Sequence, residues 1–303
     1  MFNFIKRIFL FLAVNFLVMM TVSLIVNLFG LKYALRESGF DYRGLLIFCF
    51  IWGFTGALIS LALSRWMAKK MMRIRIIDSY NPKDHAEEKL VEMMRRLCRK
   101  AHLHQLPEIG IYDSPEINAF ATGPTKNRSL VAVSSGLMHH MSDDQIEGII
   151  GHELSHIANG DMVTMTLLQG VTNAFVMFLS RIIAYIISSR FKDEKNKSSG
   201  FIYYICVFVL ELVLMLLGSL LIAAFSRYRE YKADEGGARL AGKQKMISAL
   251  EGLQAFYFSK TENVSSSSFD QMKIHHKNKT SLFELLASHP PLESRIDTLK
   301  KLR

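Results

Sequence analysis

The sequence predicts an α-helical integral membrane protein with an α+β domain on the cytoplasmic side. Half of the 303 residues are hydrophobic, and they gather in runs long enough to cross a bilayer. Polar segments between these runs contain patterns typical of amphipathic helices and short strands. One predicted helix carries the pattern H-E-x-x-H at 152–156, which indicates a metal site when both histidines lie on one helix face.

Four apolar runs are candidates for membrane spans. Residues 8–29 and 44–64 are 22 and 21 residues long and contain no charge, enough for a hydrocarbon core about 30 Å thick. The first run is too long for a signal-peptide core and has no small-residue cleavage site after it, so we expect a retained anchor. Residues 162–189 and 201–226 are also apolar, but each contains one charge.

Those two charges are Arg181 and Glu211. If the runs form a hairpin around the polar segment 190–200, both side chains lie at a similar depth, and an ion pair between them would lower the cost of burying charge. The alternative is that each side chain faces a water-filled cavity. The sequence leaves both possibilities open.

Lysine and arginine near the span ends favour both termini and residues 65–161 in the cytoplasm. The predicted organisation is two transmembrane helices in 1–64, a first part of a cytoplasmic domain in 65–161, a transmembrane hairpin in 162–226 and a second cytoplasmic part in 227–303. The net charge of +10 indicates attraction to an anionic lipid bilayer, and the absence of a basic patch interleaved with aromatic residues argues against nucleic acid as a partner.

The three cysteines, Cys49, Cys98 and Cys206, include no C-x-x-C pair. We expect them to be small apolar side chains in a reducing compartment, neither disulfides nor metal ligands.

The first cytoplasmic part predicts a helix followed by a small sheet. Residues 82–102 have amphipathic helical spacing, and short strands are expected at 107–112, 117–122 and 129–134, with turns at Ser114-Pro115 and Gly123-Pro124. The strand 117–122 is either an edge strand that pairs with an extended peptide or an ordinary structural strand.

The metal helix is predicted from Ser142 to Gly160. Ser142 and Gln145 have the spacing of a capping box, and Asn159-Gly160 is a typical helix stop. His152 and His156 lie four residues apart on one face, where they can bind one metal ion together. Glu153 is placed to reach a water on that metal. The alternative is a chance occurrence of the pattern.

A second predicted helix, 226–242, supplies a third ligand. Glu230 completes a set of two histidines and one glutamate, which is common at catalytic zinc sites. Asp234 shares its helix face and can accept a hydrogen bond that orients a ligand histidine. The membrane hairpin brings Glu230 back towards His156, although 73 residues separate them.

The C-terminal segment offers weaker candidates. Residues 259–280 are expected to form a mobile loop, in which solvent exposure of His275 and His276 is favoured over a metal role. His289 precedes Pro290-Pro291 and a final helix. Arg295 in that helix either faces the metal site or is solvated.

Four motifs together resemble the HtpX-type membrane zinc metalloproteases, which are related more distantly to the CAAX prenyl protease. The motifs are INAFATGP (117–124), GHELSHIANGD (151–161), SRYREYKADEGGA (226–238) and SHPPLESRI (288–296). Their order and spacing match, as do the spans before and between them.

The resemblance implies a zincin-like fold and one Zn²⁺ per chain on His152, His156 and Glu230, with Glu153 as the general base that activates the water. It also implies that His289 stabilises the oxyanion and that Asn118, Ala119 and Phe120 hold the substrate backbone. The implied function is a zinc metalloendopeptidase in the cell inner membrane, with its active site facing the cytoplasm. Its substrates would be peptides or misfolded or damaged membrane proteins, in protein quality control and the stress response. The alternatives are a CAAX-type prenyl-protein protease, a non-catalytic metal-bound membrane scaffold and a channel component.

Overall fold

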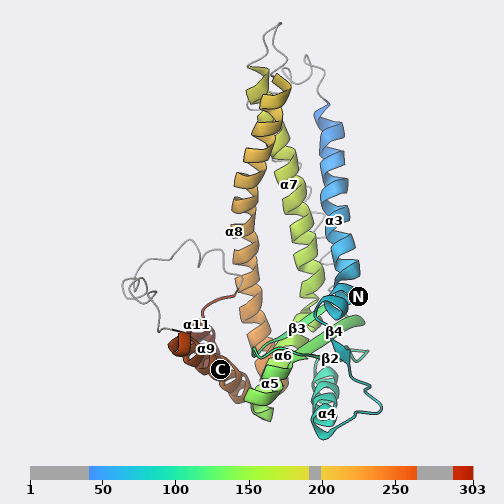
Figure 1. Cartoon of the computed structure of the whole chain (residues 1–303), viewed down its shortest axis with the longest axis vertical. Helices are drawn as coiled ribbons and strands as arrows, with labels where there is room; N and C mark the ends of the chain where they lie inside the picture. The colour runs from blue at the N-terminus through green and yellow to red at the C-terminus, as the bar shows by residue number, and fades with distance from the viewer. Residues whose placement is uncertain (1–40, 191–198, 265–288, 303) are drawn as a thin grey trace. The chain divides into compact units, whose positions relative to one another are not determined.

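The computed structural model describes residues 41–190, 199–264 and 289–302. Within them, three helices are long and apolar enough to cross a membrane: α3 (Tyr42–Met71), α7 (Asp161–Ser189) and α8 (Ser199–Ala241) (Figure 1). The predicted span 8–29 lies outside the described residues. The chain divides into two compact units, Met1–Ser60 with Thr164–Ile222, and Leu61–Val163 with Ala223–Arg303.

In the first unit, α7 packs against both other long helices at glycines. A Cβ atom on Gly53 of α3 would lie 2.7 Å from the backbone nitrogen of Ala174, and one on Gly170 would lie 2.9 Å from the ring of Phe54. A Cβ on Gly218 of α8 would lie 2.6 Å from Thr172. Small residues at these points let the helix backbones approach closely, as is usual for helices in lipid.

The charges inside the apolar runs 162–189 and 201–226 form an ion pair. Arg181 Nη1 of α7 donates to Glu211 Oε1 of α8 at 2.7 Å, and also to the carbonyl oxygen of Met177. The paired arrangement is therefore the correct one of the two alternatives for Arg181 and Glu211. The pair satisfies two groups that would be costly to leave unpaired in a membrane.

The sequence suggested a span ending at Ser226 and a separate helix after it. This was wrong, because α8 continues without a break through Ser226 to Ala241. The polarity changes near Arg227, but the next residues, up to Gly236, contain neither proline nor glycine, so nothing in the backbone ends the helix there.

The second unit contains a four-stranded sheet and the shorter helices. The strands are β1 (Arg75–Ile76), β2 (Glu108–Tyr112), β3 (Ala119–Thr125) and β4 (Arg128–Ser134), in the order β1-β2-β4-β3. In the described part of the sheet, β2 and β4 pair in parallel, and the other two pairs are antiparallel. The shorter helices among the described residues are α4 (His85–Lys100), α5 (Ser135–His140), α6 (Asp143–Asn159), α9 (Lys243–Val264) and α11 (Leu292–Lys301) (Figure 1).

The prediction of a turn at Gly123-Pro124 was wrong, because both residues lie inside β3 and the turn falls at 126–127. The pairing of β3 with β4 is irregular between Thr122 and Thr125, and Gly123 has a φ of 141°, which favours glycine. A proline is tolerated here because β3 is the last strand of the described sheet, where a missing N–H group breaks no ladder.

The strand β4 lies at the centre of the core. Val131 and Val133 face a cluster formed with α4, α5, α6 and α9, while Leu130 and Ala132 face a second cluster with Ile74 and other residues. Alternate residues thus point to opposite faces and both faces are covered. This packing holds α6 against the sheet beside the edge strand β3. It thereby positions the candidate metal ligands on α6.

Residues 259–264 were expected in a mobile loop, but they continue α9 to Val264. The segment after Gly252 contains no proline or glycine before the serine run, so the helix is not interrupted. The rest of the predicted loop, with His275 and His276, lies outside the described residues.

Candidate metal centre

The helix α6 begins and ends as its sequence predicts. Ser142 Oγ accepts from the backbone N–H of Gln145, and Gln145 Oε1 accepts from that of Ser142 at 3.0 Å. At the other end, Gly160 has φ 67° and ψ 39°, the left-handed conformation that glycine adopts without strain. Residues Ile146, Ile149, Ile150, Leu154 and Ile157 are all buried. This packing fixes the face on which His152 and His156 lie.

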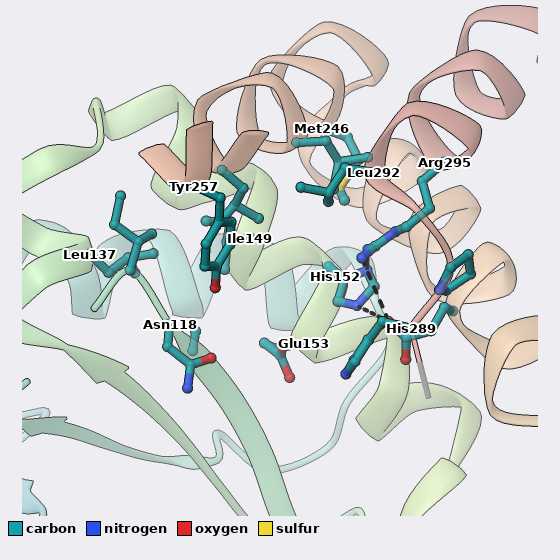
Figure 2. Close-up of a pocket in the computed structure, with 16 residues that line it drawn as sticks. Asn118, Leu137, Ile149, His152, Glu153, Met246, Tyr257, His289, Leu292 and Arg295 are labelled. Atoms are coloured by element: carbon teal, nitrogen blue, oxygen red, sulfur yellow. Dashed lines mark hydrogen bonds and ion pairs between the residues drawn. The ribbon is translucent and has the colours of Figure 1, made fainter. Parts of the chain in front are cut away.

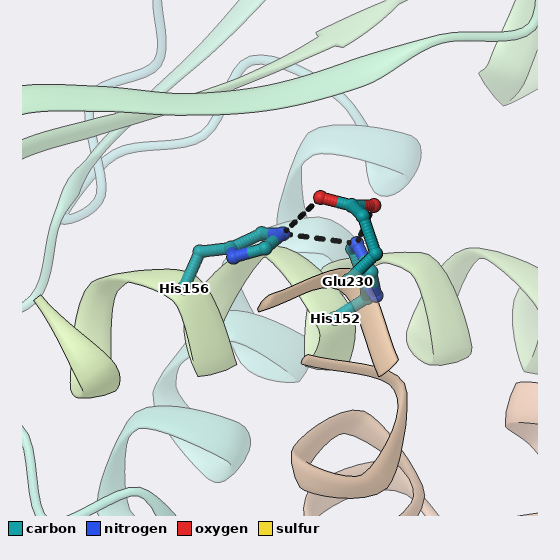
Figure 3. Close-up of side chains that lie close together, drawn as sticks. All are labelled: His152, His156 and Glu230. Atoms are coloured by element: carbon teal, nitrogen blue, oxygen red, sulfur yellow. Dashed lines mark hydrogen bonds and ion pairs between the residues drawn. The ribbon is translucent and has the colours of Figure 1, made fainter. Parts of the chain in front are cut away.

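His152, His156 and Glu230 converge on one point (Figure 3). The two imidazole Nε2 atoms are 3.1 Å apart, His152 Nε2 lies 3.5 Å from Glu230 Oε2, and His156 Nε2 lies 3.4 Å from Glu230 Oε1. Tetrahedral coordination with bonds of about 2.0–2.1 Å places two ligand atoms about 3.3 Å apart. The donor set and its spacing therefore fit a zinc ion.

The glycines of α6 and α8 bring the third residue to this point. A Cβ atom on Gly237 of α8 would lie 2.9 Å from the backbone nitrogen of His152, and one on Gly236 would lie 2.0 Å from Ser155 Oγ. A Cβ on Gly151 of α6 would lie 3.1 Å from Ala241. Glycine at these positions allows α8 to run close to α6, so that Glu230 reaches both histidines.

Each histidine is held through its other ring nitrogen by a buried aspartate. His152 Nδ1 lies 2.9 Å from Asp234 Oδ1, and His156 Nδ1 lies 2.6 Å from Asp161 Oδ2. A carboxylate accepts, so each Nδ1 carries a hydrogen, and Nε2 is the ring nitrogen that offers its lone pair when the imidazole is neutral. Two Nε2 atoms facing each other at 3.1 Å are the arrangement expected of two ligands to one cation.

Arg295 faces the site, so the alternative of a solvated side chain is wrong. Its Nε and Nη2 donate to the two carboxylate oxygens of Asp234 at 2.8 and 2.6 Å, and Nη1 lies 3.8 Å from Glu230 Oε2. Only 7% of Arg295 is exposed. This two-point contact fixes Asp234, which in turn fixes His152.

The electrostatics of the site favour positive charge. Burial alone lowers the pKa of His152, but the carboxylates of Asp234 and Glu230 outweigh it and raise that pKa to about 9. Burial acts in the same direction on His156, and Asp161 and Glu230 again raise the pKa above its ordinary value. The carboxylates that stabilise an imidazolium also stabilise a bound cation.

A cavity of about 300 Å³ opens beside the three residues (Figure 2). Glu153, His289 and Asn118 line it together with His152 and Glu230. His289, although mostly exposed, has its Nδ1 2.9 Å from Glu230 Oε2. Each of these residues was singled out from the sequence, and the structure brings them to one cavity.

The three residues expected to bind the substrate backbone are divided by the structure. Asn118 and Ala119 line the cavity, at the start of β3. The side chain of Phe120 packs instead against Tyr112 on the opposite face of the sheet, with ring centroids 5.8 Å apart. Neighbouring residues of a strand point to opposite faces, so Ala119 and Phe120 cannot both face the cavity.

Two parts of the site were not found from the sequence. The sequence indicated Asp161 only as the last residue of the motif 151–161. A signal was present, because an aspartate that follows a helix-ending glycine and begins an apolar helix is a candidate for a buried contact. The apolar lining from α9, which consists of Met246, Leu250, Leu253 and Tyr257, was also missed. Its spacing of four, three and four residues is the signal of one helix face.

Comparison with known proteins identifies the family. Residues 84–303 match the model of Peptidase family M48. The chain is 47% identical to a protease HtpX homolog of Bacillus subtilis (strain 168) and 48% identical to protease HtpX of Shewanella frigidimarina (strain NCIMB 400), in each case over 97% of this chain and 99% of the relative. The crystal structure of S. mikatae Ste24p has a similar fold, with a TM-score of 0.59 and 17% identity, covering 95% of this chain and 66% of that one.

The family match covers the part of the chain that contains every residue of the metal centre, and the described residues include three helices suited to a membrane. The chain therefore belongs to Peptidase family M48 and is a membrane metalloprotease.

Proposed function

We propose that this protease is a zinc endopeptidase that cleaves misfolded or damaged membrane proteins at the cytoplasmic face of the inner membrane. His152, His156 and Glu230 are the proposed zinc ligands, and Glu153 is the proposed general base. The observation that supports the ligand set is the contact of both Nδ1 atoms with aspartates, which leaves both Nε2 lone pairs for a metal.

Zinc bound at these residues would supply a water of lowered pKa and would polarise the scissile carbonyl group. Glu153 lines the cavity next to His152. We assign Glu153 to accept the proton of the attacking water and to deliver it to the leaving amine. His289 lines the same cavity, and we assign it to stabilise the negative charge that develops on the carbonyl oxygen.

The position of β3 supports an extended substrate. It is the terminal strand of the described sheet, and it begins at Ala119, beside the cavity. An extended peptide can pair with such a strand through backbone hydrogen bonds, which do not depend on side-chain identity. This mode of binding suits an enzyme that cleaves many unfolded segments rather than one folded target. We also propose a zincin-like fold for this domain, because a terminal strand lies beside the cavity that contains the candidate metal ligands of α6.

The connection of the site to the membrane helices supports membrane proteins as substrates. Asp161 both contacts His156 and begins α7, while Glu230 belongs to the same continuous helix as the apolar residues of α8. Glu230 follows Ser226, the end of the apolar run, by about 6 Å of helix. We therefore place the catalytic centre close to the membrane surface, on the side where Arg227 and Lys232 favour the cytoplasm.

The test is metal-dependent cleavage by the full chain purified in detergent. We expect self-cleavage, or cleavage of an unfolded substrate, to stop on addition of a chelator and to return with zinc. Glu153→Gln should abolish cleavage, because it removes the base. The exposed Glu92 of α4 provides a matched control, since Glu92→Gln should retain wild-type cleavage. Cleavage by Glu153→Gln at the wild-type rate would show that the base is wrongly assigned.

A further inference from the structure

The cavity next to the metal centre has two chemically different halves. Its polar lining consists of the groups already assigned to chemistry, with Arg295 behind them. The rest of the lining is largely apolar. Six of its residues come from three helices: Leu137 of α5, Ile149 of α6, and Met246, Leu250, Leu253 and Tyr257 of α9, while Ile117, Pro290 and Leu292 add further apolar surface. None of the chemistry proposed above uses these six residues.

The four α9 residues lie on one face of their helix, as their spacing requires. Ile149 precedes His152 and Glu153 by three and four residues, so it lies on the same face of α6 as the metal ligand and the base. The apolar half is therefore built onto the same turns of α6 as the catalytic groups. A side chain placed in it belongs to a residue close to the bond being cleaved.

The apolar half is closed at its inner end and open at its mouth. Leu137, Ile149, Met246 and Leu250 are buried, whereas half of Tyr257 is exposed. Figure 2 shows Tyr257 and Ile149 close together, with Leu137 to their left and Asn118 and Glu153 below them in the view. This arrangement forms a pocket that a side chain can enter from the direction of β3.

We propose that this pocket binds a large apolar side chain, of the leucine, methionine or phenylalanine type, on a residue that flanks the scissile bond. The proposal rests on the proposed function, because it names the substrate class of the same site. Burial of an apolar side chain against these residues is favourable. A charged side chain would lose its hydration, and the only polar side-chain group among these six residues, the Tyr257 hydroxyl, carries no opposite charge to compensate for the loss.

The proposal explains how an enzyme that binds substrate backbone at an edge strand still selects its cleavage sites. Backbone pairing along β3 would accept any extended segment. The pocket would then select segments with a large apolar residue next to the metal. Such residues are buried in folded proteins and become accessible when a protein is misfolded, so the pocket would restrict cleavage to damaged substrates.

The test uses the full chain in detergent with fluorogenic peptides. Single positions on each side of the scissile bond are varied among leucine, phenylalanine, alanine, aspartate and lysine. At one of these positions we expect kcat/KM for leucine or phenylalanine to exceed that for alanine, aspartate and lysine by at least about tenfold, given the usual discrimination by an apolar pocket.

Variants of Leu253 locate the preference in this pocket. Leu253→Ala enlarges the pocket and should shift the preference from leucine towards phenylalanine, whereas Leu253→Phe fills it and should shift it towards alanine. Leu106→Ala is the matched control, because Leu106 is also partly buried against the same core but does not line the cavity. Thermal unfolding of each variant shows that it is folded, and the wild-type profile tests the proposal without any variant.

The outcomes separate the two proposals. Chelator-sensitive cleavage without an apolar preference at any position would overturn the pocket and leave the protease assignment in place. The pocket would also be overturned if neither Leu253 variant changed the apolar preference, that is, if both gave the same profile as the Leu106→Ala control. Absence of chelator-sensitive cleavage of every peptide would overturn the proposed function, and the pocket with it.

Discussion

The carboxylate of Asp161 lies 2.6 Å from Nδ1 of His156, so the first residue of α7 orients a proposed metal ligand. The contact depends on Gly160, whose left-handed conformation turns the chain between the two helices. Asp161 is 7% exposed. The pairing reproduces at His156 what Asp234 does at His152, and it connects the metal centre to the start of a helix suited to the membrane.

Replacement of Asp161 by asparagine should weaken metal binding. The amide has a similar shape but no charge, so it holds the Nδ1–H of His156 less strongly and leaves Nε2 a poorer ligand. We expect a loss of about 10–100-fold in zinc affinity, measured by competition with a chromophoric chelator. Asp297→Asn, at an exposed position of α11, should leave the affinity unchanged. Equal affinities for wild type and Asp161→Asn would show that the contact has no role in binding.

The charges around Glu147 predict an acid-sensitive stability. Arg96 of α4 and Lys245 of α9 lie 2.8 and 2.7 Å from Glu147 Oε2. Burial alone raises the pKa of Glu147, but these two cations outweigh it and hold the pKa below its ordinary value of 4.5. The unfolded chain then binds the proton more tightly, so the stabilisation is complete above pH 4.5 and is lost as the pH falls through the folded pKa.

Thermal unfolding of wild type and Glu147→Gln checks this sign. At pH 7 the variant should be less stable by about 1.5–3 kcal/mol, the usual range for hydrogen bonds to charged groups. The difference should shrink as the pH is lowered below 4.5. A difference that stays constant from pH 7 to pH 3 would contradict the account of Glu147.

The Arg181–Glu211 pair predicts a rescue by charge exchange. Arg181→Glu or Glu211→Arg alone places two like charges side by side within apolar helices, and we expect each variant to accumulate poorly in membranes. The double variant restores an opposite pair and should recover most of the protein. Quantitative immunoblotting of membrane fractions measures this, and a double variant no better than either single one would argue against a direct interaction.

The packing of α3 against α7 predicts that Gly53 tolerates no large side chain. A Cβ atom there would lie 2.7 Å from the backbone of Ala174, whereas one on Gly56 would have no described heavy atom within 4 Å. Gly53→Leu should therefore destabilise the protein by about 1–3 kcal/mol through overpacking, and Gly56→Leu should have a smaller effect. Unfolding midpoints in detergent compare the two, and a reversed order would contradict the helix packing.

The sequence predicted the metal helix well because its signals are local. Ser142, Gln145 and Gly160 define its ends within a few residues of chain, and the buried isoleucines follow directly from helical spacing. Glu230 could also be predicted from the sequence as a candidate third ligand. That prediction needs only the residue types and their order along the chain, with a helix after the membrane hairpin, and no knowledge of tertiary contacts.

The remaining features depend on tertiary contacts. Whether Arg295 faced the site could not be read from its helix, because only the contact with Asp234 decides it. The wrong break at Ser226 came from a change of polarity, which marks the end of a membrane environment but does not end a helix. The misplaced turn at Gly123-Pro124 came from residues that are typical of turns and are equally compatible with an irregular edge strand.

The central claim is that His152, His156 and Glu230 are the ligands of one zinc ion. Glu153 is not a ligand in this account. Elemental analysis of the purified full-length protein tests it most directly. We predict one zinc per chain in wild type and in Glu153→Gln, and a loss of zinc in His156→Ala and Glu230→Gln. Full zinc content in the two ligand variants, or its loss in Glu153→Gln, would contradict the proposed centre.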